Sequence, residues 1–147
     1  MLEDRLYAYY QAVDDSKTGK ATTEDVLAFF SPELIAYKHQ GYGGVTWMHS
    51  LQDVMAFIKQ TESLFCGICQ HNITNVRLLG NVTTCKGTEY NSVRVDGAPR
   101  SVQIIFQTTI EWHTVGEGKI WSSKWKIQRM DTVTTRIYLD APSTVLL

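Results

Sequence analysis

The feature that most constrains the fold is a long alternating pattern in the C-terminal third of the chain. From about Ser101 to His113, five of the six even positions are apolar, whereas the odd positions are mostly polar. A period of two residues is typical of a strand with one buried face. The even positions, which we expect to face inward, are Val102, Ile104, Phe106, Thr108, Ile110 and Trp112.

A second arm is predicted from about Lys119 to Asp131, after a turn at residues 114–118. In this arm Trp121, Trp125 and Ile127 share one parity, and Asp131 continues it. Two arms of this length are not stable alone in water, so the hairpin needs more strands beside it and an apolar cover over one face.

The N-terminal part of the chain predicts helices that can provide this cover. Leu2, Leu6, Tyr9 and Val13 are spaced as one face of an amphipathic helix over residues 2–15. Thr22 or Thr23 can cap a second, short helix, which Ser31-Pro32 ends.

The middle of the chain predicts one strand, a glycine loop and a third helix. Glu33 to His39 is a candidate strand with Ile35, Tyr37 and His39 on one face. Gly41 to Gly44 is predicted as a loop, and a helix is expected from about Thr46. The inner face of that helix would consist of Leu51, Val54, Met55, Ile58 and Leu64.

Further strands are predicted before the long hairpin. His71 to Leu79 and Val82 to Val95 flank a Gly80-Asn81 turn, and a turn at 96–99 leads into the hairpin. Residues 137–139 extend the last strand. Helices gathered before a run of antiparallel strands indicate an α+β fold, in which a curved sheet wraps the N-terminal helices as a cone around an apolar cavity.

Length and composition limit the function classes. A chain of 147 residues is long enough for one domain with a core, and its 44% hydrophobic and 20% charged residues exclude a disordered chain. The net charge of -1 and the lack of a basic run argue against nucleic acid as a partner. No segment has the length of a membrane span or the apolar core of a signal peptide, so we expect a cytoplasmic protein that does not bind membranes.

Several short motifs, together with the order of elements, resemble the nuclear-transport-factor-2-like cone fold. This superfamily includes SnoaL-like polyketide cyclases, scytalone-type dehydratases and ketosteroid isomerases. The similar stretches are residues 29–33 (FFSPE), residues 71–82 (HNITNVRLLGNV), residues 86–90 (KGTEY) and the closing Trp125-Lys126-Ile127 with Asp131. The resemblance spans nearly all of residues 1–147, as a single domain.

The resemblance implies a homodimeric enzyme without a cofactor or metal. Its chemistry would be acid–base catalysis on a small hydrophobic carbonyl or enol compound, as in an isomerase, lyase or cyclase of secondary metabolism. In dehydratase-like members the position that matches His71 is an acid or base, assisted by residues that match Tyr9 and Asp14. In cyclase-like members a carboxylate that matches Asp131 is the base. Many cyclases have a histidine where this chain has Glu89.

The residue chemistry agrees with these assignments. A neutral imidazole such as that of His71 can accept and donate a proton near neutral pH. If Asp131 faces inward beside Trp125, desolvation would raise its pKa and make it a better base. Tyr9 could stabilise an enolate oxygen. The candidate substrate-binding residues are Tyr37, His39, Trp47, Glu89 and Trp125.

Each of these residues also has an ordinary structural interpretation. His71 would then be an edge histidine, Asp131 and Asp14 turn residues, and Tyr9 and the tryptophans part of the core. Cys66 and Cys69 form a CxxC motif that we expect at the end of a helix rather than its start, where a redox motif is typical. A zinc site would need Cys85 and His71 as further ligands.

Two other functions remain open. The same fold can serve as a non-catalytic ligand-binding or dimerisation module, since fold does not fix function. A cone filled by the chain's own tryptophans would favour that alternative. An epoxide hydrolase would need an Asp-Arg-Asp cluster in the cavity, of which Arg129 and Asp131 supply a part.

Overall fold

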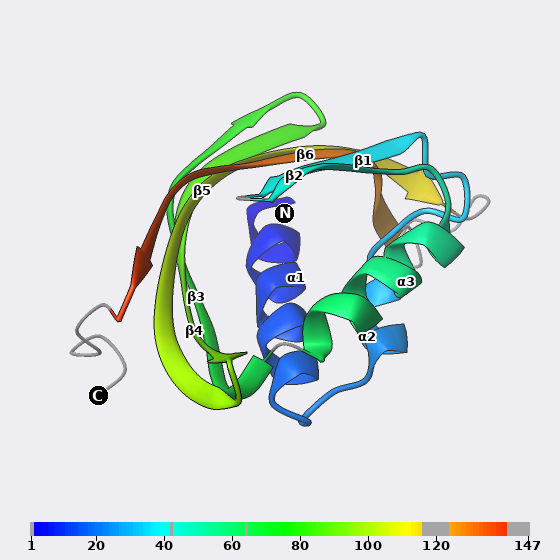
Figure 1. Ribbon diagram of the computed structural model, residues 1–147. Helices are drawn as coiled ribbons and strands as arrows, with labels where there is room; N and C mark the ends of the chain where they lie inside the picture. The colour runs from blue at the N-terminus through cyan, green and yellow to red at the C-terminus, as the bar shows by residue number, and fades with distance from the viewer. Residues whose placement is uncertain (1, 42, 64, 116–123, 141–147) are drawn as a thin grey trace.

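The computed structural model describes residues 2–41, 43–63, 65–115 and 124–140, which form three helices and one six-stranded sheet (Figure 1). The helices are α1 (Leu2–Lys17), α2 (Thr23–Leu27) and α3 (Leu51–Glu62). The strands are β1 (Ala36–Gly41), β2 (Gly44–Met48), β3 (Phe65–Leu79), β4 (Val82–Val95), β5 (Ala98–Val115) and β6 (Lys124–Leu139). None of the helices in these segments is long and apolar enough to cross a lipid bilayer.

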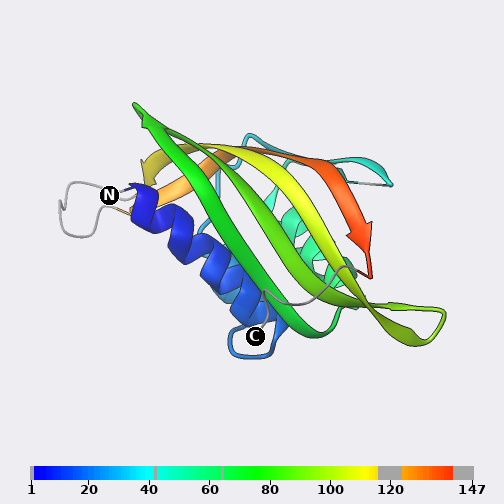
Figure 2. The same cartoon turned by 90° about the vertical axis from the view of Figure 1, so that its left-hand side faces the viewer.

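The sheet has the strand order β2-β1-β6-β5-β4-β3 and curls around α1. Neighbouring strands are antiparallel, except for the parallel pair β1 and β6. Figure 1 shows α1 inside the concave face, with α2 and α3 on the side that the sheet leaves open. Figure 2 shows β3 running beside α1 along the length of the helix. The α+β cone predicted from the sequence is confirmed.

The long hairpin is present and longer than predicted. Strand β5 pairs with β4 on one side and β6 on the other, and β6 continues to Leu139 as expected. Along β5 the predicted inner face is confirmed, with Val102, Phe106, Ile110 and Trp112 buried. Residues 116–123 lie outside the described part of the chain, and they include Trp121 and most of the turn predicted at residues 114–118.

Strand β6 differs from the predicted alternation because it contains two bulges. Trp112 pairs with Ile127 while Glu111 pairs with Arg129, so Gln128 is an extra residue on β6. A one-residue shift exchanges the two faces of a strand. Beyond the bulge Met130 and Thr132 face inward, and Asp131 is exposed. The prediction that Asp131 shares the inner face of Ile127 is therefore wrong.

The N-terminal helices agree with the sequence pattern, but the segment after them does not. Helix α1 buries Leu2, Leu6 and Tyr9, and Thr22 caps α2 through a reciprocal capping box with Asp25. Strand β1 starts at Ala36, so Ile35 precedes the strand and is exposed rather than sharing the face of Tyr37 and His39.

The predicted glycine loop connects the two strands of a short β-hairpin, and the predicted helix start at Thr46 is wrong, because it lies in the second strand. Residues 44–48 form strand β2, which pairs with β1 and places Trp47 opposite Lys38. The helix begins at Leu51, because the side chain of Ser50 accepts a hydrogen bond from the backbone N–H of Asp53 and caps it.

Strand β3 begins at Phe65, six residues before the predicted start. His71 is therefore a mid-strand residue, and the CxxC motif lies on a strand rather than at the end of a helix. The side chain of Cys66 lies outside the described side chains, and Cys69 is buried.

Gly87 on β4 allows the aromatic ring of its β5 partner Phe106 to pack directly against the β4 backbone on the concave face of the sheet. A Cβ atom at this position would lie 2.9 Å from Phe106 Cε1, closer still to Cζ, and 3.1 Å from Ile73 Cδ1. Phe106 is buried and lies against the rings of Tyr10 and His71. Because Gly87 has no side chain, Phe106 can occupy this position and form part of the inner wall of the cone.

We predict that Gly87→Ala lowers the free energy of unfolding by about 1–3 kcal/mol, as overpacking of a dense core does. Urea unfolding followed by tryptophan fluorescence measures this change. Gly43→Ala is a matched control, because no described atom lies within 4 Å of a Cβ at that position. Equal stability of the two variants would contradict this account of Gly87.

Candidate active site

The concave face of the sheet, α1 and α3 enclose a cavity of about 230 Å³. This volume is below the range of about 300–1,000 Å³ that is usual for sites of drug-sized ligands, so it suits a small molecule. The lining combines aliphatic, methionine and phenylalanine side chains with tyrosines and a smaller set of other polar groups. The polar and charged ones are Tyr9, Tyr10, Ser16, Lys17, Tyr37, His39, Thr61, His71, Glu89, Thr132 and Thr134.

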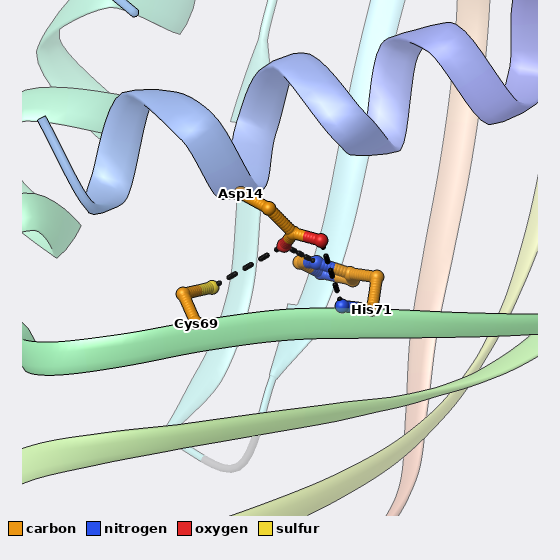
Figure 3. A group of neighbouring side chains, drawn as sticks. All are labelled: Asp14, Cys69 and His71. Atoms are coloured by element: carbon orange, nitrogen blue, oxygen red, sulfur yellow. Dashed lines mark hydrogen bonds and ion pairs between the residues drawn. The ribbon is translucent and has the colours of Figure 1, made fainter. Parts of the chain in front are cut away.

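One wall of the cavity carries a triad of Asp14, His71 and Glu89. Asp14 Oδ1 accepts a hydrogen bond from His71 Nδ1, and Asp14 Oδ2 accepts one from the backbone N–H of His71 at 2.9 Å. On the other side of the ring, His71 Nε2 lies 2.7 Å from Glu89 Oε1. Figure 3 shows the Asp14 carboxylate pointing from α1 toward β3. The imidazole is thus held between two carboxylates.

The local periodicities of three elements bring the triad together. Tyr10 and Asp14 are four residues apart and share the face of α1 that lies on β3. Cys69 and His71 are two residues apart on β3, so their side chains lie on the same face of the strand. His71 is the cross-strand partner of Glu89 on β4. The Tyr10 ring lies 5.0 Å from the His71 ring, and its hydroxyl donates to Thr108 Oγ1 at 2.8 Å.

A second pair of donors supports the two carboxylates. Cys69 Sγ lies 3.5 Å from Asp14 Oδ1 and can donate its proton to it, and Asn91 Nδ2 donates to Glu89 Oε2. Cys69 and Asn91 are cross-strand partners, and both are buried. Each carboxylate therefore accepts hydrogen bonds from His71 and from one supporting side chain.

The charges of the triad are coupled. Burial lowers the pKa of His71, but the charge of Glu89 and the hydrogen bond to Asp14 outweigh burial and raise it well above its usual value. Burial raises the pKa of Glu89, but the positive charges of Lys17 and His71 outweigh burial and bring it to about 2. At neutral pH the site therefore holds an imidazolium beside the Glu89 carboxylate.

A second group of polar side chains lines the cavity from α1 and β1. Burial raises the pKa of the Tyr9 and Tyr37 hydroxyls, which interact with each other and remain protonated donors. Burial lowers the pKa of His39, partly opposed by Glu89, so its imidazole is neutral. The His39 ring packs 4.9 Å from the ring of Phe57.

The structure brings together most, but not all, of the site residues predicted from the sequence. Tyr9, Tyr37, His39, His71 and Glu89 line one cavity, and Asp14 lies directly behind His71.

Three predicted residues lie elsewhere. Asp131 is exposed on the outer face, where its neighbours in the strand register are Lys38 of β1 and Thr109 of β5. Trp47 is exposed on β2 and stacks on His49, and Trp125 packs against the core. Among the described residues, none of the three lines the cavity.

Sequence reasoning missed Tyr10, Lys17, Asn91 and the contact of Cys69 with Asp14. The spacing held a usable signal for two of them. Asn91 is two residues after Glu89 and so shares its face of the strand, and Tyr10 is one helical turn before Asp14.

Three of these side chains could in principle bind a metal ion. Asp14, Cys69 and His71 offer ligand atoms that lie within 4.8 Å of one another. The hydrogen bonds from His71 and Cys69 to Asp14 account for this cluster without a metal. Cys85, the other cysteine considered for zinc, is buried but not part of the cluster formed by the described residues.

Many solved structures have the same fold, but the three described below share only 12% to 14% sequence identity with this chain. No protein-family model matches the chain, and no curated protein is significantly similar to it. The provisionally named scytalone dehydratase of Novosphingobium aromaticivorans has a TM-score of 0.68 at 13% identity, covering 96% of this chain and 85% of its own.

Two further structures show the same similarity. A type 2 hexachlorocyclohexane dehydrochlorinase has a TM-score of 0.63 at 12% identity, covering 96% of this chain and 94% of its own. A nuclear-transport-factor-2-like protein of unknown function from Exiguobacterium has a TM-score of 0.63 at 14% identity, covering 88% and 97%. The chain has the nuclear-transport-factor-2-like fold, as its motifs predicted.

The charges of the triad predict how stability depends on pH. The pKa of Glu89 is depressed from 4.5 to about 2, so its ion pair contributes above about pH 4.5 and is lost as the pH falls toward 2. The raised pKa of His71 acts in the opposite sense, since its contribution is lost as the pH rises through that value.

We therefore expect wild type to exceed Glu89→Gln in unfolding free energy by up to about 3 kcal/mol near pH 5–6. This difference should shrink as the pH is lowered to 2. Urea unfolding of both proteins across this range measures it, with Glu33→Gln, an exposed carboxylate, as the control. A difference that stays constant from pH 6 to pH 2 would contradict the ion pair.

Proposed function

We propose that this protein is a cofactor-independent enzyme that abstracts a proton next to the carbonyl group of a small hydrophobic metabolite. The observation that carries the proposal is the buried Asp14–His71–Glu89 triad on one wall of an apolar cavity whose lining also includes the hydroxyls of Tyr9 and Tyr37. The reaction class is that of an isomerase, lyase or cyclase.

The two groups have complementary roles in such a reaction. The triad accepts the proton, and general acid–base groups of this kind typically contribute about 10²–10⁴-fold to rate. The hydrogen-bonded pair of hydroxyls of Tyr9 and Tyr37 keeps one proton that can be donated to the oxygen on which enolate charge develops. The apolar lining binds the rest of the molecule and holds it in place.

The likeness to enzymes of the same fold supports the proposal at the level of reaction class. The dehydratase and the dehydrochlorinase cited above are both named for elimination reactions. From the motif resemblance we further propose a polyketide- or terpenoid-like substrate, a role in secondary metabolism and a homodimer. We also propose the cytoplasmic location expected from the sequence. Light scattering that shows a single-chain mass in solution would contradict the dimer.

A non-catalytic binding module is the alternative, since an apolar cavity alone would serve to carry a ligand. The described residues do not fill the cone, and Trp112 packs in the core, its indole N–H donating to Thr83 Oγ1 at 2.9 Å. An ion triad on the cavity wall is not needed for carrying an apolar ligand. The epoxide hydrolase hypothesis lacks its cluster, because Arg129 and Asp131 are both exposed on the outer face.

The exchange of C–H hydrogens of small carbonyl compounds for solvent deuterium tests this function directly. A panel of cyclic ketones and 1,3-diketones is incubated with the protein in D₂O, and deuterium uptake next to the carbonyl is measured by mass spectrometry. We expect wild type to accelerate exchange for at least one compound. Asp14→Asn and Tyr9→Phe should each reduce that rate by about tenfold to a hundredfold.

Asp131→Asn is the matched control, because Asp131 is a carboxylate on the outer face of the same sheet. Its exchange rate should equal that of wild type. Binding of a ketone without accelerated exchange would favour the carrier, and an Asp131→Asn rate as low as that of Asp14→Asn would refute the site.

A further inference from the structure

The hydrogen bonds of His71 leave it no free position toward a substrate. An imidazole has two ring nitrogens, and each makes one bond in the plane of the ring. Nδ1 is bonded to Asp14 and Nε2 lies 2.7 Å from Glu89. A histidine that is bonded at both nitrogens can neither take a proton from a bound molecule nor give one to it without breaking a buried ion pair.

Glu89 has the free positions that His71 lacks. A carboxylate offers about four lone-pair sites on its two oxygens. Here His71 uses one site on Oε1 and Asn91 uses one on Oε2, so each oxygen keeps a lone pair. Glu89 also lines the cavity, whereas Asp14 is not among the described residues that do. The side chain of Glu89 is 14% exposed and that of His71 only 5%.

Building on the proposed function, we propose that Glu89 is the catalytic base that takes the substrate proton. His71 is its fixed positive partner, and Asn91 is a positioning residue that orients the carboxylate. In this step the substrate C–H bond breaks and the proton goes to a Glu89 oxygen. The electron pair of that bond moves into the enolate, whose oxygen accepts a hydrogen bond from the Tyr9–Tyr37 pair.

The charges around Glu89 fit this role. Glu89 interacts electrostatically with Lys17, Tyr9 and Tyr10 of α1, with His71 of β3, and with Tyr37 and His39 of β1. Asp14 lies on the far side of the His71 ring. Together Lys17 and His71 keep the carboxylate ionised at neutral pH. A low pKa reduces the driving force for proton transfer, and the donors Tyr9 and Tyr37 offset that cost by stabilising the enolate.

Nuclear magnetic resonance of histidine-labelled protein tests the role of His71 without any substrate. Long-range ¹⁵N–¹H spectra distinguish protonated from bare ring nitrogens, and His71→Gln assigns the signals. We expect both nitrogens of His71 to be protonated at pH 7. One bare nitrogen at pH 7 would overturn the assignment, because His71 could then act as the base itself.

A reactive ketone identifies the residue that meets the substrate carbon. With 2-bromoacetophenone, a carboxylate oxygen attacks the CH₂ carbon, a C–O bond forms, and bromide leaves as the C–Br bond breaks. Peptide mapping by mass spectrometry locates the adduct and counts cysteine adducts separately. We expect an ester on Glu89 that Glu89→Gln abolishes and that the exposed-site control Glu33→Gln retains.

The outcomes separate this inference from the proposed function. An adduct on His71 instead of Glu89 overturns the inference alone. No adduct on any cavity residue, with His71 doubly protonated in the spectra, shows that the cavity does not accept ketones. That result refutes the proposed function and the inference that depends on it.

The role of Asn91 has its own readout. Asn91→Leu removes the hydrogen bond that favours the ionised form of Glu89, so the pKa of Glu89 should rise. The rate of ester formation, measured from pH 3 to 8, should then begin to fall at a higher pH than in wild type, in which the pKa of Glu89 is about 2. Asn91→Ser, which keeps a donor, should restore part of the wild-type profile. A profile that is unchanged in Asn91→Leu would overturn the positioning role.

Discussion

The charged contact between α1 and the sheet is the constraint on which the rest of the site depends. Asp14 links the helix to β3 through His71, and His71 links β3 to Glu89 of β4. Burying ions costs several kcal/mol each, and only well-placed partners and hydrogen bonds compensate for this cost. Apolar side chains of similar volume would pack this interface at lower cost. Stability alone therefore does not account for the triad, and its position on the wall of a cavity supports the chemical role that we propose for it.

The shape of the cavity depends on irregularities in β6 that re-aim its side chains. The extra residues Gln128 and Thr135 each interrupt the pairing with β5. A bulge bends its strand and increases the local twist, which helps the sheet to curl around α1. The first bulge also directs Met130 and Thr132, rather than Asp131, toward the cavity. One inserted residue thus removes a predicted catalytic carboxylate from the site and supplies a methionine and a hydroxyl in its place.

Periodicity predicted the regular parts of the fold and failed where tertiary contacts decide. The even positions of β5 and the stripe of α1 were assigned correctly, because each element has one buried face along its length. Strand β2 was missed, since a short segment such as residues 44–48 becomes a strand only by pairing with β1. The site was predictable one residue at a time from family motifs. No spacing in the sequence shows that Asp14, His71 and Glu89 meet, because 57 residues separate the first two and the contact forms only when α1 lies inside the sheet.

Glu89 changes the chemistry that this fold can offer, relative to members with a histidine at the matching position. A second histidine there would leave one nitrogen of His71 without a carboxylate partner and free to act as a base. With Glu89, both nitrogens of His71 are engaged, and the negative charge lies beside the cavity rather than behind it. Lys17 offsets part of that charge from the C-terminal end of α1. A carboxylate ligand close to Glu89 would meet like-charge repulsion in a site of low dielectric constant. For the reaction that we propose, the arrangement therefore favours an uncharged molecule that presents an acidic C–H to Glu89 and an oxygen to the Tyr9–Tyr37 pair.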